Sequence, residues 1–302
     1  MILLASPGQG AQSPGFLQPW LEVPGVADRL TWWSAVTGLD LVRYGTEADA
    51  EEIRDTAVAQ PLLVSAALAA AAALDVTPGA VAGHSVGELA AAALAGVLTP
   101  EAALVLVRER GRAMAEAAAV TETGMTAVLG GDPDEVLTAI DKHGLTPANI
   151  NGAGQVVAAG TMRQLAEFAD EPPAKARLRP LSVAGAFHTV HMAPAVDRLQ
   201  ALAPGMPVAD PAVTLLSNRD GAVVTDGREY VRRLVEQVSA PVRWDSCMAT
   251  MRELGVTAII ELPPAGTLVG LARRELKGVE TLALKTPEDL DKARELIKAH
   301  SA

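Results

Sequence analysis

The chain has 302 residues, of which 49% are apolar and 20% charged, and its formal net charge is −11. This composition is typical of a soluble globular protein with one large domain or two smaller ones. The acidic balance argues against a nucleic-acid binder and against docking on anionic lipid, since both need a basic face. The single cysteine, Cys247, excludes an intrachain disulfide and fits a reducing compartment, so we expect a cytoplasmic protein.

Two apolar runs could be targeting or membrane-spanning segments. The run Ile2–Ala5 lacks a basic flank and is followed by glycines, so it predicts a first strand rather than a signal peptide. The run from Val64 to Leu74 has about 11 residues, which is too short to span a bilayer.

Strands and helices alternate in the first part of the chain, which implies a parallel sheet covered by helices. Thr99 and Pro100 are typical of a helix N-terminus, and Pro61 lies near the start of an earlier helix. The predicted elements are strands at Ile2–Ala5 and Val81–Gly83 and helices at Gln60–Leu74, Val86–Leu94 and Pro100–Ala119.

The pattern changes near Gly124 to a βαββαβ order, which is the ferredoxin-like unit. Its predicted elements are Met125–Leu129, Pro133–His143, Ala148–Asn151, Gln155–Ala159, Met162–Ala169 and Ala176–Val183. Alternation then resumes with a helix from His188 to Leu202, a strand at Val213–Leu216, a helix at Tyr230–Val238 and a strand at Ala258–Glu261. The expected fold is α/β: a parallel-sheet, hydrolase-like large domain formed by residues 1–123 and 187–302, with a ferredoxin-like small domain inserted at residues 124–186.

The sequence Gly83-His84-Ser85-Val86-Gly87 lies between a predicted strand and a helix, as in a nucleophile elbow. Flanking glycines would allow a sharp turn at the serine, and the helix N-terminus would supply N–H groups to a developing oxyanion. The alternative is a packing turn without chemistry. We expect Glu88, in the first helical turn, to interact favourably with the helix dipole.

A nucleophilic serine needs a base, and the chain has five histidines. We expect His143 and His300 to be solvated, and His84 to point away from the serine and support the structure. His188 and His191 remain, and we prefer His188 because it lies at a loop–helix junction. Their HxxH spacing could suggest a metal pair, but no acidic or cysteine ligand is near, so no metal site is predicted.

Arg110 lies on an apolar helix face, with Leu106, Val107, Ala113 and Met114 as helical neighbours. A buried arginine needs an anion, since an unpaired buried charge is unfavourable. Either an internal salt bridge or the carboxylate of a substrate would provide one.

The loop Gly8-Gln9-Gly10-Ala11-Gln12 follows the first predicted strand. It lacks the third glycine of a dinucleotide-binding loop, so an oxyanion-hole donor is a better interpretation than a phosphate cradle.

Together these stretches resemble the malonyl-CoA:acyl carrier protein transacylase family, the acyltransferases of fatty acid and polyketide synthesis. The resemblance covers essentially the whole chain. The motifs, in the family's order and spacing, are GQGAQ, GHSVGE, RGRAM, GAFH, the stretch from Asn149 to Val156 and Pro241-Val-Arg-Trp244.

The resemblance implies ping-pong chemistry, in which Ser85 accepts the malonyl group and the phosphopantetheine thiol of the carrier protein then removes it. His188 would be the general base and acid, oriented by the backbone carbonyl of Gln237, while Arg110 would pair with the malonyl carboxylate. The N–H groups of Gln9 and Val86 would form the oxyanion hole. Further positions that the family implies for the cleft are Gln60, Asn149 and Asn151.

Phe187 would favour malonyl over methylmalonyl by filling the space that a methyl branch needs, although Gly185 replaces the first histidine of the malonyl-specific signature. The resemblance implies no permanently bound cofactor, coenzyme A thioester as substrate, and holo acyl carrier protein as partner. We expect a discrete, monomeric enzyme. The other hypotheses are a serine hydrolase, a non-catalytic module that binds the carrier protein, and a transacylase for a different acyl group.

Overall fold

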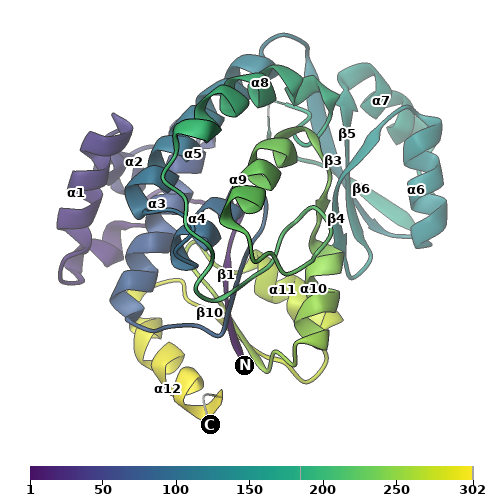
Figure 1. Ribbon diagram of the computed structural model, residues 1–302. Helices are drawn as coiled ribbons and strands as arrows, with labels where there is room; N and C mark the ends of the chain where they lie inside the picture. Colours follow the sequence, from purple (N-terminus) through teal and green to yellow (C-terminus); the bar gives the residue numbers. More distant parts are fainter. Residues whose placement is uncertain (184, 301–302) are drawn as a thin grey trace.

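The computed structural model describes residues 1–183 and 185–300 (Figure 1). Its larger sheet contains five parallel strands in the order β10-β9-β1-β2-β7, which confirms the predicted parallel sheet. The predicted strand at residues 258–261 is found with the same ends, and the predicted 213–216 strand is shorter. The bounds are β1 (Ile2–Ser6), β2 (Ala80–Gly83), β7 (Thr214–Leu215), β9 (Ala258–Glu261) and β10 (Glu280–Ala283).

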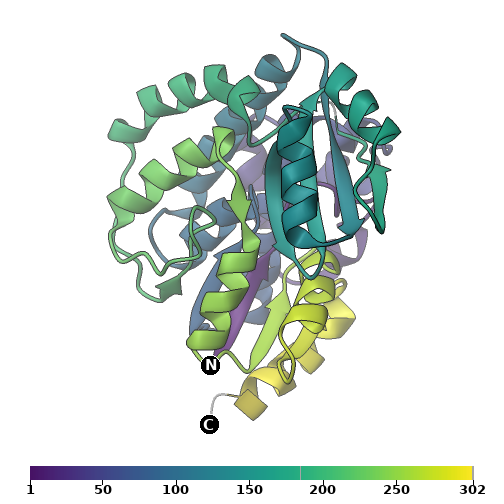
Figure 2. The ribbon, with the colours of Figure 1, turned by 90° about the vertical axis from the view of Figure 1, so that its right-hand side faces the viewer.

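Helices cover both faces of this sheet, and alternate strand residues contribute to two separate cores. On β1, Leu4 packs with helices α3, α4 and α5 on one face, whereas Leu3 packs with α10 and α11 on the other. Both layers are visible when Figures 1 and 2 are compared. The bounds are α3 (Thr56–Leu74), α4 (Gly87–Leu94), α5 (Pro100–Ala118), α10 (Trp244–Glu253) and α11 (Thr267–Glu275).

Helix α3 begins earlier than predicted, because Asp55 caps it by accepting a hydrogen bond from the Ala57 N–H. Its 19 residues are long and apolar enough to cross a membrane, so the expectation of a segment too short to do so was wrong. However, 83% of this apolar stretch is buried within the protein. Its hydropathy is therefore that of a core helix, apolar all round because protein surrounds it.

The second sheet has the strand order β6-β3-β5-β4-β8. Its first four strands are antiparallel neighbours, and the elements β3-α6-β4-β5-α7-β6 follow the predicted βαββαβ order along the chain. Helices α6 and α7 lie together at one side of the molecule (Figure 1). The bounds are β3 (Thr123–Gly130), α6 (Pro133–Lys142), β4 (Thr146–Gly152), β5 (Gln155–Thr161), α7 (Met162–Asp170) and β6 (Ala176–Pro180).

Strand β8 (Val242–Arg243) joins the second sheet from a distant part of the sequence and pairs in parallel with β4. This pairing joins the predicted insertion to the segment that leads directly into α10. Both parts of the chain also line one pocket, since Ser85 and His188 line it together with Asn149 of β4. The remaining helices are α1 (Val26–Thr37), α2 (Leu41–Thr46), α8 (Ala193–Leu202), α9 (Gly227–Glu236) and α12 (Leu290–His300).

Candidate active site

Ser85 lies in the turn between β2 and α4, with a left-handed backbone (φ 53°) that a residue with a side chain rarely adopts. The turn is tight enough to demand glycine on both sides. A Cβ on Gly87 would lie 2.2 Å from the Ser6 carbonyl oxygen, and one on Gly83 would lie 2.0 Å from the Gly87 carbonyl carbon. The predicted sharp bend at the serine is therefore confirmed.

Asn218 holds this turn in place, and no sequence motif pointed to it. Its Oδ1 accepts a hydrogen bond from the Ser85 N–H at 2.7 Å, and its Nδ2 donates to the Gly83 carbonyl at 2.7 Å. The signal available in the sequence was a polar pair, Ser217-Asn218, directly after a predicted strand. Strand β7 neighbours β2, so this pair lies at the edge of the sheet where Ser85 lies.

His188 is the histidine that reaches the serine: its Nε2 lies 2.7 Å from Ser85 Oγ. Its Nδ1 lies 2.7 Å from the carbonyl oxygen of Gln237, which can only accept, so Nδ1 carries the proton and Nε2 is free to accept one. Burial, assisted by the charge of Arg110, lowers the pKa of His188 to about 3. The imidazole is therefore neutral and positioned as a base.

The other histidines are all in different surroundings. His84 also lines the pocket, and its Nε2 lies 2.9 Å from Asn151 Oδ1, a contact that fits the expected structural role. His143 packs edge-on against Phe168, and His300 bonds Thr257 and Glu280, so neither is simply solvated as expected. Among residues 1–183 and 185–300, no group of three or more His, Cys, Asp or Glu side chains could hold a metal ion.

Arg110, on α5, is 2% exposed and its guanidinium faces amide oxygens rather than a carboxylate. It donates to Gln60 Oε1 at 2.6 Å and to Gln237 Oε1 at 2.8 Å, and its Nη2 lies 3.5 Å from Ser85 Oγ. No ion pair of Arg110 is found within the described part of the chain. The internal salt bridge considered from the sequence is therefore wrong, and the guanidinium next to the serine lacks a directly bound anion.

Glu88 is more deeply buried and has more hydrogen-bond partners than the expected helix-dipole role requires. It is 1% exposed and accepts hydrogen bonds from the Asn218 N–H, from Gln237 Nε2 and from the Tyr230 hydroxyl. Burial raises the pKa of its carboxyl group to about 7. Glu88 thus lies in the first turn of α4, as expected, and is also a buried centre of the polar network next to Ser85.

A small pocket of about 80 Å³ opens onto Ser85 and His188. Five more predicted site residues line it: Gln9, Gln60, Val86, Asn149 and Phe187. Three do not. Arg110 and Gln237 lie next to Ser85, since Arg110 Nη2 is 3.5 Å from Ser85 Oγ and Gln237 Nε2 donates to the Ser85 carbonyl at 3.0 Å. Asn151 is bonded to His84.

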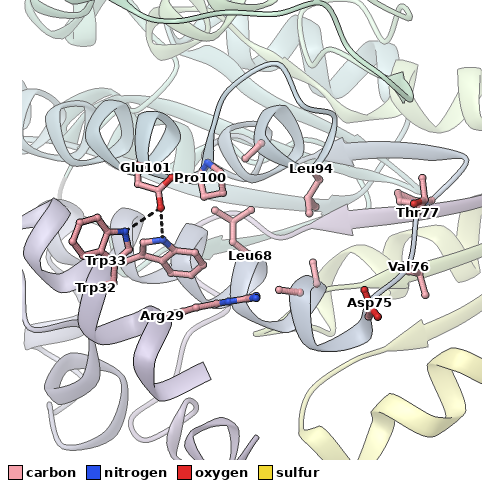
Figure 3. A pocket seen from close by; sticks show the side chains of 14 residues that line it. Arg29, Trp32, Trp33, Leu68, Asp75, Val76, Thr77, Leu94, Pro100 and Glu101 are labelled. Carbon is pink, nitrogen blue, oxygen red and sulfur yellow. Dashed lines mark hydrogen bonds between the residues drawn. The ribbon is translucent and has the colours of Figure 1, made fainter. Parts of the chain in front are cut away.

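A larger groove lies elsewhere, has a volume of about 490 Å³, and is lined by none of the predicted site residues. In Figure 3 the indoles of Trp32 and Trp33 both donate to Glu101 at one end of it, with Arg29 beneath them. It offers no nucleophile next to a base. We therefore place the chemistry in the smaller pocket, where the reactive groups converge.

The chain belongs to the acyl transferase domain family, whose model matches residues 22–292, and it is an acyltransferase. Curated relatives identify the branch of the family, since they are named malonyl CoA-acyl carrier protein transacylase. The one from Mycobacterium tuberculosis (strain H37Rv) is 55% identical, with 98% of this chain and 100% of the relative covered. The one from Bacillus subtilis is 34% identical, with 98% and 97% covered. The resemblance drawn from the motifs is confirmed.

Solved structures agree with the sequence relatives. The Mycobacterium tuberculosis crystal structure named MCAT has a TM-score of 0.94 and 54% identity, and covers 97% of this chain and 99% of its own. A malonyl-transacylase in complex with a type II polyketide synthase acyl-carrier protein has a TM-score of 0.93 and 30% identity, with 98% and 99% covered.

Proposed function

We propose that this chain transfers a malonyl group from malonyl-CoA to the phosphopantetheine thiol of holo acyl carrier protein through a covalent intermediate on Ser85. One observation carries the proposal: Ser85 Oγ lies 2.7 Å from a neutral histidine and 3.5 Å from a buried arginine that has no carboxylate partner. A nucleophile, a base and a receptor for a carboxylate suit an acyl group that is itself an anion.

In the first half-reaction, Ser85 Oγ attacks the thioester carbonyl carbon while His188 Nε2 takes the hydroxyl proton. The tetrahedral intermediate collapses, the carbon–sulfur bond breaks, and His188 returns the proton to the leaving thiolate of coenzyme A. In the second half-reaction His188 takes the proton of the carrier thiol, and the sulfur attacks the ester carbonyl carbon. The bond between that carbon and Ser85 Oγ then breaks, and His188 returns the proton to Ser85 Oγ.

The oxyanion of each tetrahedral intermediate would be held by the N–H groups of Gln9 and Val86. Both residues line the pocket beside Ser85. Among the hydrogen bonds of the described residues, neither N–H donates to an acceptor. Two such donors near the N-terminus of α4 would stabilise negative charge that develops in the transition state.

Arg110 would bind the malonyl carboxylate, with Gln60 and Gln237 keeping the guanidinium aimed at Ser85. The Gln237 carbonyl orients His188, so no acidic third member of a triad is needed. Phe187 would restrict branched acyl groups. Two residues earlier, a Cβ on Gly185 would lie 2.9 Å from the Phe187 ring, so a larger side chain there would have to displace the ring. Asn149 would contact substrate, and Asn151 would act through His84.

Coenzyme A thioester would be a substrate, with no cofactor bound permanently. The relatives' names support malonyl-CoA and acyl carrier protein as the two partners. The product would feed fatty acid synthesis, with polyketide synthesis as the alternative. We further propose a cytoplasmic monomer that binds neither nucleic acid nor membrane, on the acidic net charge and the single cysteine.

We propose the domain division expected from the sequence: a hydrolase-like large domain (1–123 and 187–302) and a ferredoxin-like insert (124–186). Residues 184 and 301–302 lie outside the described part of the chain. The separate sheets and the separate core around Phe168 support this division. The pairing of β8 with β4 adds one strand of the large domain to the insert's sheet.

The test is to incubate the protein with malonyl-CoA without acceptor, then to measure intact mass and map the adduct by peptide. We expect a malonyl group on Ser85 that is discharged by holo carrier protein, and no adduct on the Ser85→Ala variant. The Ser246→Ala variant, changed on α10, is the matched control. Discharge by water at the same rate with or without carrier would identify a hydrolase instead. The absence of both adduct and turnover would leave only a binding module.

A further inference from the structure

A continuous line of hydrogen bonds connects Glu88 to the guanidinium next to the nucleophile. The Glu88 carboxylate accepts from Gln237 Nε2, and Gln237 Oε1 at the other end of the same amide accepts from Arg110 at 2.8 Å. All three side chains are at least nine-tenths buried. The negative charge of Glu88 is thus near Arg110 without occupying the positions where a second carboxylate would bind.

The direction of the Gln237 amide is fixed by its surroundings. Above its pKa of about 7 the Glu88 carboxylate can only accept, so the amide must present its NH2 group to Glu88, and the same group donates to the Ser85 carbonyl at 3.0 Å. Its oxygen must then face Arg110, which can only donate. Glu88 is fixed in turn, because its other oxygen accepts from the Asn218 N–H at 2.7 Å.

We propose that Glu88 is a positioning residue that sets the acyl-group selectivity of the enzyme: as an acceptor-only group it orients Gln237, which aims Arg110 at the carboxylate of the acyl group. This inference rests on the proposed function, since it concerns how Ser85 is loaded with an anionic rather than a neutral acyl group. Glu88 itself touches no substrate.

The Glu88→Gln substitution isolates this role because it keeps the shape and removes the acceptor-only character. The new amide must keep its oxygen on the Asn218 N–H, so its NH2 group faces the NH2 group of Gln237. Either the two amides separate, or Gln237 turns over and presents an NH2 group to Arg110. In both cases the Arg110 guanidinium loses a hydrogen-bond acceptor and is no longer held in its orientation towards Ser85.

The experiment measures binding without turnover at about pH 8.5, where Glu88 is ionised, in a Ser85→Ala background, by calorimetry with malonyl-CoA and with acetyl-CoA. We expect Glu88→Gln to weaken the binding of malonyl-CoA about tenfold or more, which is the effect of perturbing a charge-assisted hydrogen bond. The affinity for acetyl-CoA should stay within about twofold of the parent value. The matched control is Glu261→Gln, which alters another buried carboxylate and should leave the malonyl-to-acetyl ratio unchanged.

Each other outcome overturns the proposal. Equal weakening of both thioesters would mean that Glu88 only supports the fold. Tighter malonyl-CoA binding would mean that Glu88 acts as a competing charge and not through Gln237. No change in either affinity would remove Glu88 from selectivity altogether.

A second variant decides the question if Glu88→Gln does not fold. Gln237→Met cuts the same line of bonds at its middle and retains the backbone carbonyl that holds His188. It should lower the malonyl-to-acetyl ratio as Glu88→Gln does, and an unchanged ratio would contradict the inference. Parent Ser85→Ala protein that fails to prefer malonyl-CoA would instead count against the proposed function, so the two failures are distinguishable.

Discussion

Two strand-to-helix turns at the same edge of the large sheet, β2–α4 and β9–α11, each contain a buried carboxylate with different partners. Glu261 accepts from the main-chain N–H groups of Gly266, Leu268 and Val269 and so caps α11. Glu88 accepts one main-chain N–H, but its other partners are the side chains of Gln237 and Tyr230. Burial raises the pKa of both carboxyl groups. Burial and a raised pKa therefore do not distinguish a carboxylate next to the active site from one that only caps a helix. The hydrogen-bond partners of the two carboxylates do distinguish them.

The backbones of the two turns also differ, because the residue with a positive φ is glycine in one turn and serine in the other. In the β9–α11 turn a glycine, Gly266, adopts the positive φ. In the β2–α4 turn Ser85 adopts it, which costs of order 1–2 kcal/mol for a residue with a side chain and persists because Asn218 holds both sides of the turn. The first turn retains strain to expose a hydroxyl, and the second does not.

The largest expected effect tests whether chemistry is confined to the first turn. His188→Ala removes the base that faces Ser85 Oγ, so malonyl loading of Ser85 should slow by more than about a thousandfold. Rapid-quench mass spectrometry of the acylated peptide measures the rate.

The control, His191→Gln, changes the other histidine that the sequence left as a candidate and should load at close to the parent rate. At the second turn, folded Glu261→Gln protein should also accept the malonyl group at close to the parent rate. Slow loading of either variant, or normal loading of His188→Ala, would contradict the assignment of the base.

The next effect concerns what the first turn can select. Arg110→Ala should slow malonyl loading about a hundredfold and acetyl loading much less. Only the malonyl group has a carboxylate, and that carboxylate would lose two charge-assisted hydrogen bonds to the guanidinium. Competition between the two thioesters, read by mass, measures the ratio.

Arg112→Ala, two residues along the same helix, is the control, since Arg112 is exposed and pairs with Glu109. A parent-like malonyl-to-acetyl ratio in Arg110→Ala would remove the arginine from substrate recognition.

Local sequence patterns correctly predicted the features that are determined by residues close together in the sequence. The glycines around Ser85, the cap at Thr99 and the alternation of strands and helices all appear in the structure where the sequence placed them. Motif spacing brought Ser85, His188 and Arg110 into one list, and the fold brings them within hydrogen-bond distance.

The polar network could not be predicted, because its members come from α4, α5, the end of α9 and the loop after β7. Nothing near Glu88 in the sequence shows that Gln237 will cover it, so a helix-dipole role was the reasonable local expectation. Asn218 was missed for the same reason: its partners Ser85 and Gly83 are more than a hundred residues away. Helices α1 and α2 were not predicted either, although Leu30 and Leu41 pack them against the main core.

Helices α4 and α11 each contain a glycine, and replacing each one by alanine compares the two turns by their effect on stability. Gly87→Ala should destabilise the protein by more than about 2 kcal/mol, because its Cβ would collide with main-chain atoms of β1 that cannot move away. In Gly270→Ala, inside α11, the new Cβ would meet no described atom within 4 Å apart from its chain neighbours and its own helix backbone, so the change should stabilise by about 0.5–1 kcal/mol. Urea unfolding measures both, and a stable Gly87→Ala would show that the elbow tolerates a wider turn.

The smallest expected change is in the pH dependence of loading by a neutral acyl group. The folded pKa of His188 is depressed from 6.5 to about 3, so its base form persists as the pH falls below 6.5. The titratable groups that act on it are Arg110, which lowers its pKa and stays protonated, and His84. The Glu88 carboxyl group, which is bonded to Gln237, has a pKa of about 7 that lies within the tested range. If Glu88 acts only on the malonyl carboxylate, acetyl loading (kcat/KM) should stay within about twofold between pH 7.5 and 5.5, while malonyl loading declines. An acid limb for acetyl loading centred near pH 6.5 would show that His188 titrates like a solvated histidine, and that burial next to Arg110 does not distinguish the first turn from the second.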